Sequence, residues 1–241
     1  MTGGRVVIDM SKCIACKSCQ VACQQWHSLE AEDTTFTGSY QNPPDMSGAN
    51  LTVEKFKEVV VGGKLKWLFF KDQCRHCEGA WCALACPKYA IQKTAAGIVK
   101  IDPEKCIPDG PNGCSGLPIK PCQQYCFFNV PKYNYVKNGN PVETKMMKCD
   151  LCYDRLGNLL LPLSSRRPAC MVACPPGVIT VGANGNSMWT TAVARAKTLR
   201  NHGFPNATIY PHQQGPWGAT HVIWILPDDW RLYDLPGYGY Y

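Results

Sequence analysis

Sixteen cysteines stand in four groups of four along this chain of 241 residues. The groups are Cys13, Cys16, Cys19 and Cys23; Cys74, Cys77, Cys82 and Cys86; Cys106, Cys114, Cys122 and Cys126; and Cys149, Cys152, Cys170 and Cys174. Each group ends with a gap of three residues, and proline directly follows the second and fourth groups. Grouped thiolates at short spacing are typical ligands of metal and iron–sulfur centres.

The first group has the spacing C-x2-C-x2-C-x3-C, which resembles the bacterial ferredoxin run. A cubane cluster needs one thiolate for each of its irons, and three cysteines two apart can wrap a loop around three corners. We expect the fourth cysteine to lie where a short helix begins, to point away from its own cube and to ligate the neighbouring one. Four such groups predict four [4Fe-4S] clusters with no thiolate left over.

Three other uses of cysteine explain the pattern less well. Disulfide scaffolds are usually small secreted domains, and no apolar signal segment precedes Cys13. Structural zinc sites pair two short knuckles and give no reason for repeated three-residue gaps before Cys-Pro. Scattered buried thiols would not form quartets. The third quartet is irregular, with seven-residue gaps on both sides of Cys114, and seventeen residues separate Cys152 from Cys170.

The positive net charge of the chain would by itself suggest binding to nucleic acid, but the charge of the predicted clusters offsets it. The formal charge is +7, but an oxidised cubane with four thiolates carries about −2, so four clusters bring the protein to about −1. We therefore expect no nucleic-acid binding. No apolar run of eighteen residues exists, so we expect no membrane span. With so many cysteines, clusters are expected to replace much of the usual hydrophobic packing.

Few regular elements are needed to position the cysteines. Apolar patterning and turn residues predict a strand at Arg5–Asp9, a hairpin of Leu51–Val61 and Lys64–Phe70 about Gly62-Gly63, and strands at Gly97–Ile101 and His221–Leu226. A helix is expected at Ser187–Arg200, with Ser187 as its N-cap. Residues 28–50 are rich in Gly, Pro, Ser, Thr and Asn and predict an ordered loop.

The order of the quartets predicts an α+β fold with two ferredoxin-like, dicluster modules. Nineteen residues separate the second quartet from the third, so these two suit one compact module, and the first and fourth quartets must then form another around it. The expected division is an outer module of residues 1–27 and 145–180, an insertion with a β-hairpin at 28–70, an inner module at 71–144, and a C-terminal helix and strand extension with a docking tail at 181–241.

The chain resembles the iron–sulfur electron-transfer (beta) subunits of molybdenum or tungsten bis-pterin oxidoreductases, and most specifically those of soluble formate dehydrogenases. The resemblance covers nearly the whole chain and is carried by the order of the quartets and by CQVACQQWH (Cys19–His27), QNPPD (Gln41–Asp45), WLFFKDQCRHC (Trp67–Cys77), KCDLCYDR (Lys148–Arg155), RPAC (Arg167–Cys170) and LYDLP (Leu232–Pro236). The chain departs from the soluble subunits, which have incomplete second and third quartets and three clusters, and is similar there to the four-cluster members. We also expect no C-terminal membrane helix of the kind that the respiratory members have, so a soluble complex, or one docked by other subunits, is the better fit.

The resemblance implies which cysteines share a cluster. The implied sets are Cys13, Cys16, Cys19 and Cys174; Cys23, Cys149, Cys152 and Cys170; Cys74, Cys77, Cys82 and Cys126; and Cys86, Cys106, Cys114 and Cys122. In the family the outer module faces the catalytic subunit, and the inner module faces the electron acceptor.

The resemblance further implies a non-catalytic subunit that relays electrons between a large pterin-containing catalytic subunit and an external acceptor or donor, such as a cytochrome, a ferredoxin or a further redox subunit. The alternatives are a free-standing polyferredoxin, a cluster-bearing structural subunit, and the beta subunit of a polysulfide, arsenate, dimethyl sulfoxide or nitrate reductase. Two locations stay open: a cytoplasmic complex, or a periplasmic one exported with a signal-bearing partner.

Other residues are expected to act on the clusters or on partners rather than to catalyse. His76 lies inside the second quartet, but four thiolates leave it no expected role as an iron ligand. His27 and Trp26 are expected to pack or to contact a partner. Lys71, Lys88 and Lys148 flank cysteines and are expected to raise cluster potentials. Docking surfaces are expected at residues 28–50 and at the tyrosines of the C-terminal end: Tyr233, Tyr238, Tyr240 and Tyr241.

Overall fold

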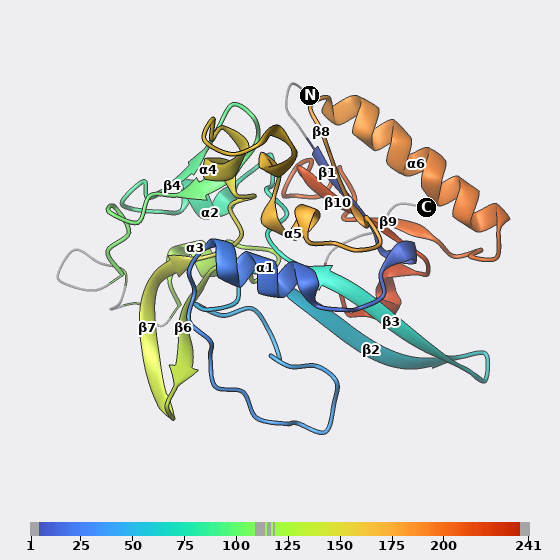
Figure 1. Ribbon diagram of the computed structural model, residues 1–241, viewed down its shortest axis with the longest axis horizontal. Coiled ribbons are helices and arrows are strands. Elements are labelled where there is room, and N and C mark those ends of the chain that lie inside the picture. Colours follow the sequence, from blue (N-terminus) through green and yellow to red (C-terminus); the bar gives the residue numbers. More distant parts are fainter. Residues whose placement is uncertain (1–4, 109–113, 115–116, 118, 237–241) are drawn as a thin grey trace.

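A four-stranded sheet joins the two ends of the chain in the computed structural model, which describes residues 5–108, 114, 117 and 119–236. Its strands, in spatial order, are β8 (Ile179–Gly182), β1 (Arg5–Asp9), β10 (Val222–Leu226) and β9 (Thr208–Tyr210). β1 runs parallel to β10 and antiparallel to β8. Every residue of β1 and β10 is buried, so the predicted strands at 5–9 and 221–226 are confirmed and form the centre of the sheet (Figure 1).

Helix α6 (Gly185–Asn201) lies along one face of this sheet (Figure 1). Three of its buried residues, Ala192, Ala196 and Leu199, pack against buried aliphatic residues of the sheet such as Ile223. The helix is confirmed, but the predicted N-cap is wrong. Asn184 caps it instead, because its side-chain oxygen accepts hydrogen bonds from the backbone N–H groups of both Asn186 and Ser187.

Three antiparallel hairpins contain the remaining strands of the residues that the structure describes. They are β2 (Val53–Val61) with β3 (Lys64–Asp72), β4 (Ile91–Lys93) with β5 (Val99–Ile101), and β6 (Lys132–Lys137) with β7 (Asn140–Met147). The predicted hairpin about Gly62-Gly63 is confirmed, and both glycines have the positive φ that the turn requires, at 58° and 75°. The sequence analysis missed the β6–β7 hairpin, although Asn138 and Gly139 form the same kind of turn.

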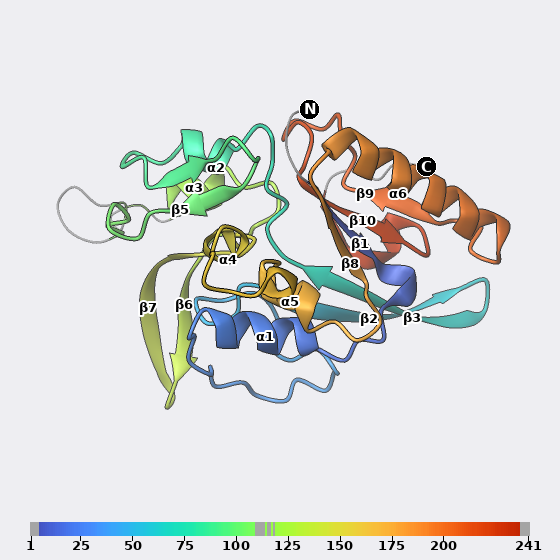
Figure 2. The ribbon, with the colours of Figure 1, turned by 45° about the horizontal axis from the view of Figure 1, so that its top comes forward.

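Each cysteine quartet carries a short helix. The four helices are α1 (Ser18–Trp26), α2 (Trp81–Leu84), α3 (Pro121–Gln124) and α5 (Ala169–Val172). Each begins at the residue before the third cysteine of its quartet, so the expectation that a helix begins at the fourth cysteine is wrong. The gap of three residues is one helical turn, and this turn carries the chain from the third cysteine to the fourth. α1 packs against α5, and α2 packs against α3 (Figure 2).

Helix α4 (Tyr153–Leu156) and three 3₁₀ turns complete the regular elements of the described chain; the turns lie at Met10–Lys12, Leu163–Ser165 and Trp230–Tyr233. In the part of the chain that the structure describes, none of the helices combines the length and the apolar character that a membrane span requires.

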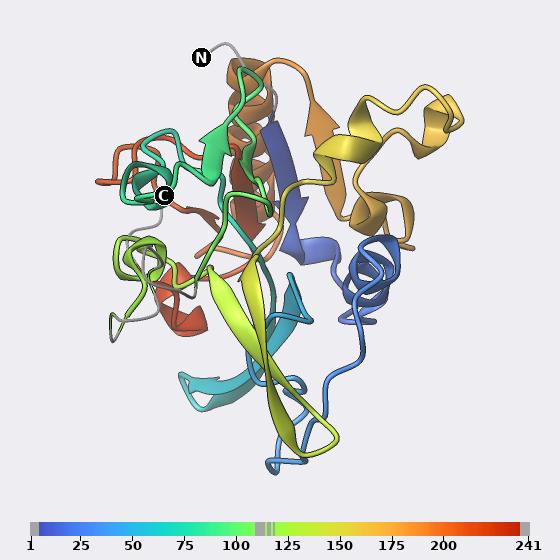
Figure 3. The same cartoon turned by 90° about the vertical axis from the view of Figure 1, so that its left-hand side faces the viewer.

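Residues 28–50, described throughout, form neither helix nor strand, as predicted. The segment runs beside the β6–β7 hairpin (Figure 3) and is bonded to it. The N–H of Asp33 donates to the carbonyl of Val136 at 2.7 Å, and that of Gly48 donates to the carbonyl of Asn134 at 2.8 Å.

Candidate iron–sulfur sites

Three hollows in the structure are each lined by four cysteines, three from one quartet and one from another. The lining sets are Cys13, Cys16, Cys19 and Cys174; Cys74, Cys77, Cys82 and Cys126; and Cys86, Cys106, Cys114 and Cys122. We call these the first, third and fourth sets. In the first set, none of the cysteines takes part in a disulfide.

The other four cysteines also lie together, and we call them the second set. Burial raises the pKa of the Cys23 thiol, and the neighbouring thiols of Cys149, Cys170 and Cys152 raise it further. Cys23 belongs to the first quartet in sequence, but in the structure it lies beside three cysteines of the fourth quartet. The four sets are the same groups of residues that the resemblance implies.

A repeated backbone turn presents the first cysteine of three of the quartets. The N–H two residues later donates to the cysteine sulfur, from Ala15 to Cys13 and from His76 to Cys74, both at 3.4 Å. Leu151 does the same for Cys149 at 3.5 Å. Ala15, His76 and Leu151 all have positive φ, between 49° and 56°. This conformation is uncommon for residues other than glycine and turns successive N–H groups toward one point.

A second repeated turn presents the last cysteine of three of the quartets. The N–H four residues later donates to the sulfur, and each of the three bonds is 3.4 Å long; the pairs are Ala90 with Cys86, Val130 with Cys126, and Val178 with Cys174. The residue just before each donor again has positive φ. N–H groups aimed at sulfur favour a thiolate over a thiol. The local backbone is therefore arranged to hold sulfur as an anionic ligand.

The thiol chemistry fits iron–sulfur clusters. Burial raises the pKa of Cys19 to about 12 and that of Cys122 to about 11, so these groups are neutral at neutral pH unless a metal binds them. Iron binds the thiolate form and would displace the proton. Sets of four sulfurs around a hollow supply the number of ligands that a [4Fe-4S] cluster requires.

Two of the three lysines singled out from the sequence are buried among these cysteines. Lys71 donates to Thr52 Oγ1 at 2.9 Å and to the side chain of Gln73. Burial lowers the pKa of its ammonium, but the negative charges that Cys170, Cys19, Cys149 and Cys23 carry as thiolates outweigh burial and raise this pKa. Lys71 therefore lies between the first and second sets.

Lys148 is also buried and donates to the carbonyl oxygens of Val99 and Cys149. Lys88 is half-buried. The structure thus separates the three lysines into two buried charges and one that solvent can screen.

Three further side chains contact the cysteines and were not recognised from the sequence in this role. Tyr133 Oη lies 2.7 Å from Cys122 Sγ, and Cys13 Sγ lies 3.5 Å from Glu54 Oε1. Burial raises the pKa of Glu54 to about 7 despite the nearby charge of Lys71. His27, which the sequence analysis assigned to packing or to a partner contact, places Nε2 3.9 Å from Cys152 Sγ and 3.4 Å from Asp150 Oδ1.

His76 is fully buried and uses its Nδ1 to accept the N–H of Val99 at 2.9 Å. The expected docking residue Tyr233 is buried and packs against Phe70, so it does not belong to an exposed docking surface. Tyr238, Tyr240 and Tyr241 lie outside the described residues. The docking role of residues 28–50 stays a prediction.

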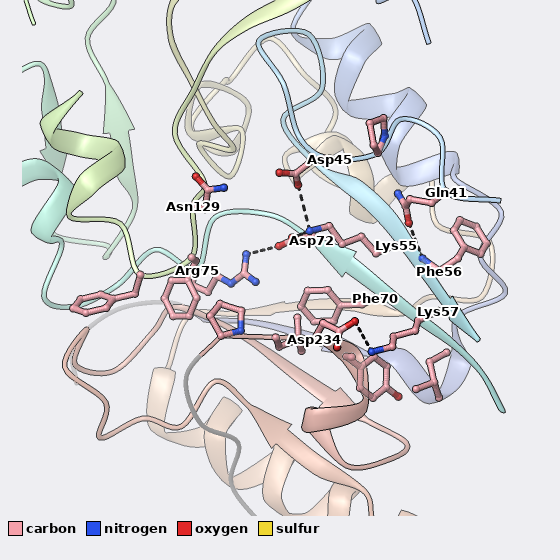
Figure 4. A pocket seen from close by; sticks show the side chains of 17 residues that line it. Gln41, Asp45, Lys55, Phe56, Lys57, Phe70, Asp72, Arg75, Asn129 and Asp234 are labelled. Carbon is pink, nitrogen blue, oxygen red and sulfur yellow. Dashed lines mark hydrogen bonds and ion pairs between the residues drawn. The ribbon is translucent and has the colours of Figure 1, made fainter. Parts of the chain in front are cut away.

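A cavity of about 520 Å³ lies beside the third set, between the β2–β3 hairpin, Phe127–Asn129 and the segment before Pro236 (Figure 4). Its charged groups are paired with one another. Lys55 lies 2.7 Å from Asp72 and 3.3 Å from Asp45, while Arg75 also pairs with Asp72. These ion pairs connect the insertion and the hairpin to the loop that carries Cys74 and Cys77, so they hold the cysteine loop in place.

Comparison with known proteins agrees with this geometry. Residues 65–184 match the model of the 4Fe-4S dicluster domain family, so about half of the chain resembles a domain of that kind. It is 38% identical over 221 residues to the iron–sulfur subunit of the nitrate-inducible formate dehydrogenase of Escherichia coli, covering 91% of this chain and 67% of the relative. It is 34% identical over 232 residues to formate dehydrogenase 2 subunit beta (cytochrome c-553) of Nitratidesulfovibrio vulgaris, covering 94% of both chains.

A third relative, the formate dehydrogenase subunit beta of Megalodesulfovibrio gigas, is 35% identical over 175 residues, which are 73% of this chain and 74% of the relative. The chain belongs to the family of iron–sulfur (beta) subunits of formate dehydrogenases. The predicted class, a non-catalytic iron–sulfur subunit of an oxidoreductase complex, is therefore confirmed. The chain spans about two thirds of the length of the Escherichia coli relative.

Proposed function

We propose that this chain carries four [4Fe-4S] clusters and relays electrons between a molybdenum- or tungsten-pterin catalytic subunit of the formate dehydrogenase type and an external acceptor or donor. The observation that carries the proposal is the gathering of sixteen cysteines into four sets of four, each drawn from two quartets. One-electron transfer is the chemistry that such clusters supply when bound. The protein holds the thiolates, shields all of them except the exposed Cys16 at least partly from water, and sets the surrounding charge.

The proposed ligands are the four sets described above, and the proposed architecture is that of two dicluster modules, one within the other. The pairing of β1 with β8 and the packing of α1 against α5 support an outer module. The contact between α2 and α3 supports an inner one. In each module, the last cysteine of one quartet joins the set formed by the other quartet. In the outer module, Cys174 joins the first set and Cys23 joins the second. In the inner module, Cys126 joins the third set and Cys86 joins the fourth.

The first test is the iron content. Anaerobically purified protein should contain about sixteen irons and about sixteen acid-labile sulfides per chain, because each cubane has four of each. About twelve of each would mean that one set, with the irregular third quartet as the first candidate, does not hold a full cluster. Zinc in place of iron would contradict the proposal.

The second test separates the subunit from a free-standing polyferredoxin. In a purified complex with the co-expressed catalytic subunit, formate should reduce the clusters of this chain, as measured by their absorbance and paramagnetic resonance signals. A chain that binds no large subunit and exchanges electrons only by diffusion would support the polyferredoxin alternative.

A further inference from the structure

Arg75 stands in the loop between the first two cysteines of the second quartet, and it is only 1% exposed. Its side chain lines the third hollow together with the four cysteines of the third set. An arginine side chain does not lose its proton in a protein. A permanent positive charge therefore lies beside the third set, and the sequence analysis assigned it no role.

Aromatic side chains surround the guanidinium of Arg75. Its central carbon lies 4.7 Å from the ring centroid of Phe128, 5.2 Å from that of Trp224, 5.7 Å from that of Phe70 and 6.0 Å from that of Tyr210. The faces of aromatic rings attract a cation, and they do so most strongly where the cation is desolvated. The rings thus fix the position of a charge that solvent and salt screen only weakly.

The carboxylate that pairs with Arg75 is shared with a second cation. Arg75 donates to Asp72, and Lys55 Nζ also lies 2.7 Å from Asp72 Oδ2 (Figure 4). The next carboxylate, that of Asp45, is shared in the same way between Lys55 at 3.3 Å and Lys132 at 2.8 Å. Two carboxylates therefore serve three cations, so Asp72 does not fully neutralise Arg75.

The thiols of the third set respond to this charge. Burial raises the pKa of the Cys77 thiol and that of the Cys126 thiol, and the positive charge of Arg75 opposes the rise in both. Arg75 thus favours negative charge on two ligands of the set. Reduction of a bound cluster adds one negative charge, so the same guanidinium favours the reduced form.

We propose that Arg75, with Asp72 as its counter-charge, raises the reduction potential of the cluster bound by the third set; this inference rests on the proposed function. A purely structural role explains the arrangement less well, because a buried ion pair can often be replaced by apolar side chains without loss of stability. Arg75 acts through the charge that it places beside the ligands Cys77 and Cys126.

The test is a redox titration of the purified, iron-loaded protein, followed by paramagnetic resonance. The signal of the third set is the one that Cys126→Ala removes. Arg75→Met should shift the equilibrium between the oxidised and reduced cluster at least about tenfold toward the oxidised form, which is about 59 mV for one electron. Asp72→Asn removes the counter-charge and should shift the same equilibrium in the opposite direction. Arg75→Lys keeps a positive charge and should stay closer to the wild type than Arg75→Met.

Lys57→Met is the matched control. Lys57 lines the cavity beside the third set, as Arg75 does, but it pairs with Asp234, whose side chain is 75% exposed. Because solvent screens this pair, Lys57→Met should leave the potential of the third-set cluster unchanged.

Wild-type potentials in both Arg75→Met and Asp72→Asn at full iron content, or shifts of the same sign in both, would overturn the inference and leave the pair a structural role. If Arg75→Met loses the cluster of the third set, Asp72→Asn decides, because a potential that does not rise in that variant contradicts the inference. A wild-type chain that holds no cluster in the third set would instead contradict the proposed function, and the inference falls with it.

Discussion

Lys71 is a buried positive charge among cysteines of two different sets. Because Lys71 is fully buried, solvent and salt screen its charge less than they screen an exposed lysine. A unit charge about 8 Å away contributes about 2 kcal/mol at an effective dielectric constant of about 20. For a one-electron couple this energy corresponds to roughly 90 mV. A positive charge stabilises the reduced, more negative form of a cluster and so raises its potential.

The variant Lys71→Met removes this charge at similar side-chain volume. We expect the potentials of the clusters in the first and second sets to fall by about 50–100 mV, measured by redox titration with paramagnetic resonance. Lys88→Met is the control, because the half-buried Lys88 is partly screened by solvent and should cause a smaller shift. Wild-type potentials in a Lys71→Met protein with full iron content would contradict this role.

The sequence indicates the candidate ligands more directly than it indicates the side chains that surround them. Cysteine spacing alone identifies four quartets, since the chemistry of a cubane requires grouped thiolates. Nothing in the local sequence indicates that Tyr133 contacts Cys122. The same holds for the contact between Glu54 and Cys13, which are forty-one residues apart. Such contacts depend on how distant elements pack. Lys71 and Lys148 were accessible to prediction because they stand a few residues from cysteines.

At the scale of elements, α1 carries two cysteines of the same quartet to different sets. Cys19 and Cys23 are one helical turn apart, so they share a face of α1 but lie at different heights along its axis. Cys19 lines the first hollow, while Cys23 is buried beside Cys149, Cys152 and Cys170. The short helix acts as a spacer between two sites.

This geometry predicts different losses for two cysteines of one quartet. Cys23→Ala should remove the signal of the cluster in the second set and leave that of the first, whereas Cys13→Ala should do the opposite. Paramagnetic resonance of the reduced variants, with iron analysis, distinguishes the two. Loss of the same signal in both variants would mean that each quartet holds its own cluster.

The elements themselves were predictable where the signal is local. The Gly62-Gly63 turn and the apolar periodicity of α6 are local signals of this kind. The Asn138-Gly139 turn is an equally local signal, although no hairpin was predicted from it. The parallel pairing of Val6 with Val222 is not local. Both β1 and β10 are apolar strands, and sequence patterning cannot say which strand lies beside which when more than two hundred residues separate them.

At the scale of the whole molecule, the chain contains two kinds of core. One is aliphatic: Ala192, Ala196 and Leu199 of α6 pack against Ile223 and other residues of the four-stranded sheet, and no cysteine belongs to this cluster of buried residues. The other surrounds the cysteines, where the helices α2, α3 and α5 have only four residues each and β4 and β5 have three. Elements this short are not stable without tertiary contacts.

Removal of the clusters should therefore affect the two cores differently. Without clusters, the hollows lined by cysteines become cavities, and unfilled cavities in a core destabilise it. The sheet with α6 keeps its aliphatic packing. We expect the apo-protein, prepared by chelation of iron under reducing anaerobic conditions, to lose amide hydrogen-exchange protection in residues 74–108 and 119–131 while β10 and the buried side of α6 stay partly protected. Uniform loss of protection would show that the clusters support the aliphatic core as well, whereas protection retained around Cys74 and Cys122 would show that the inner cysteine loops fold without iron.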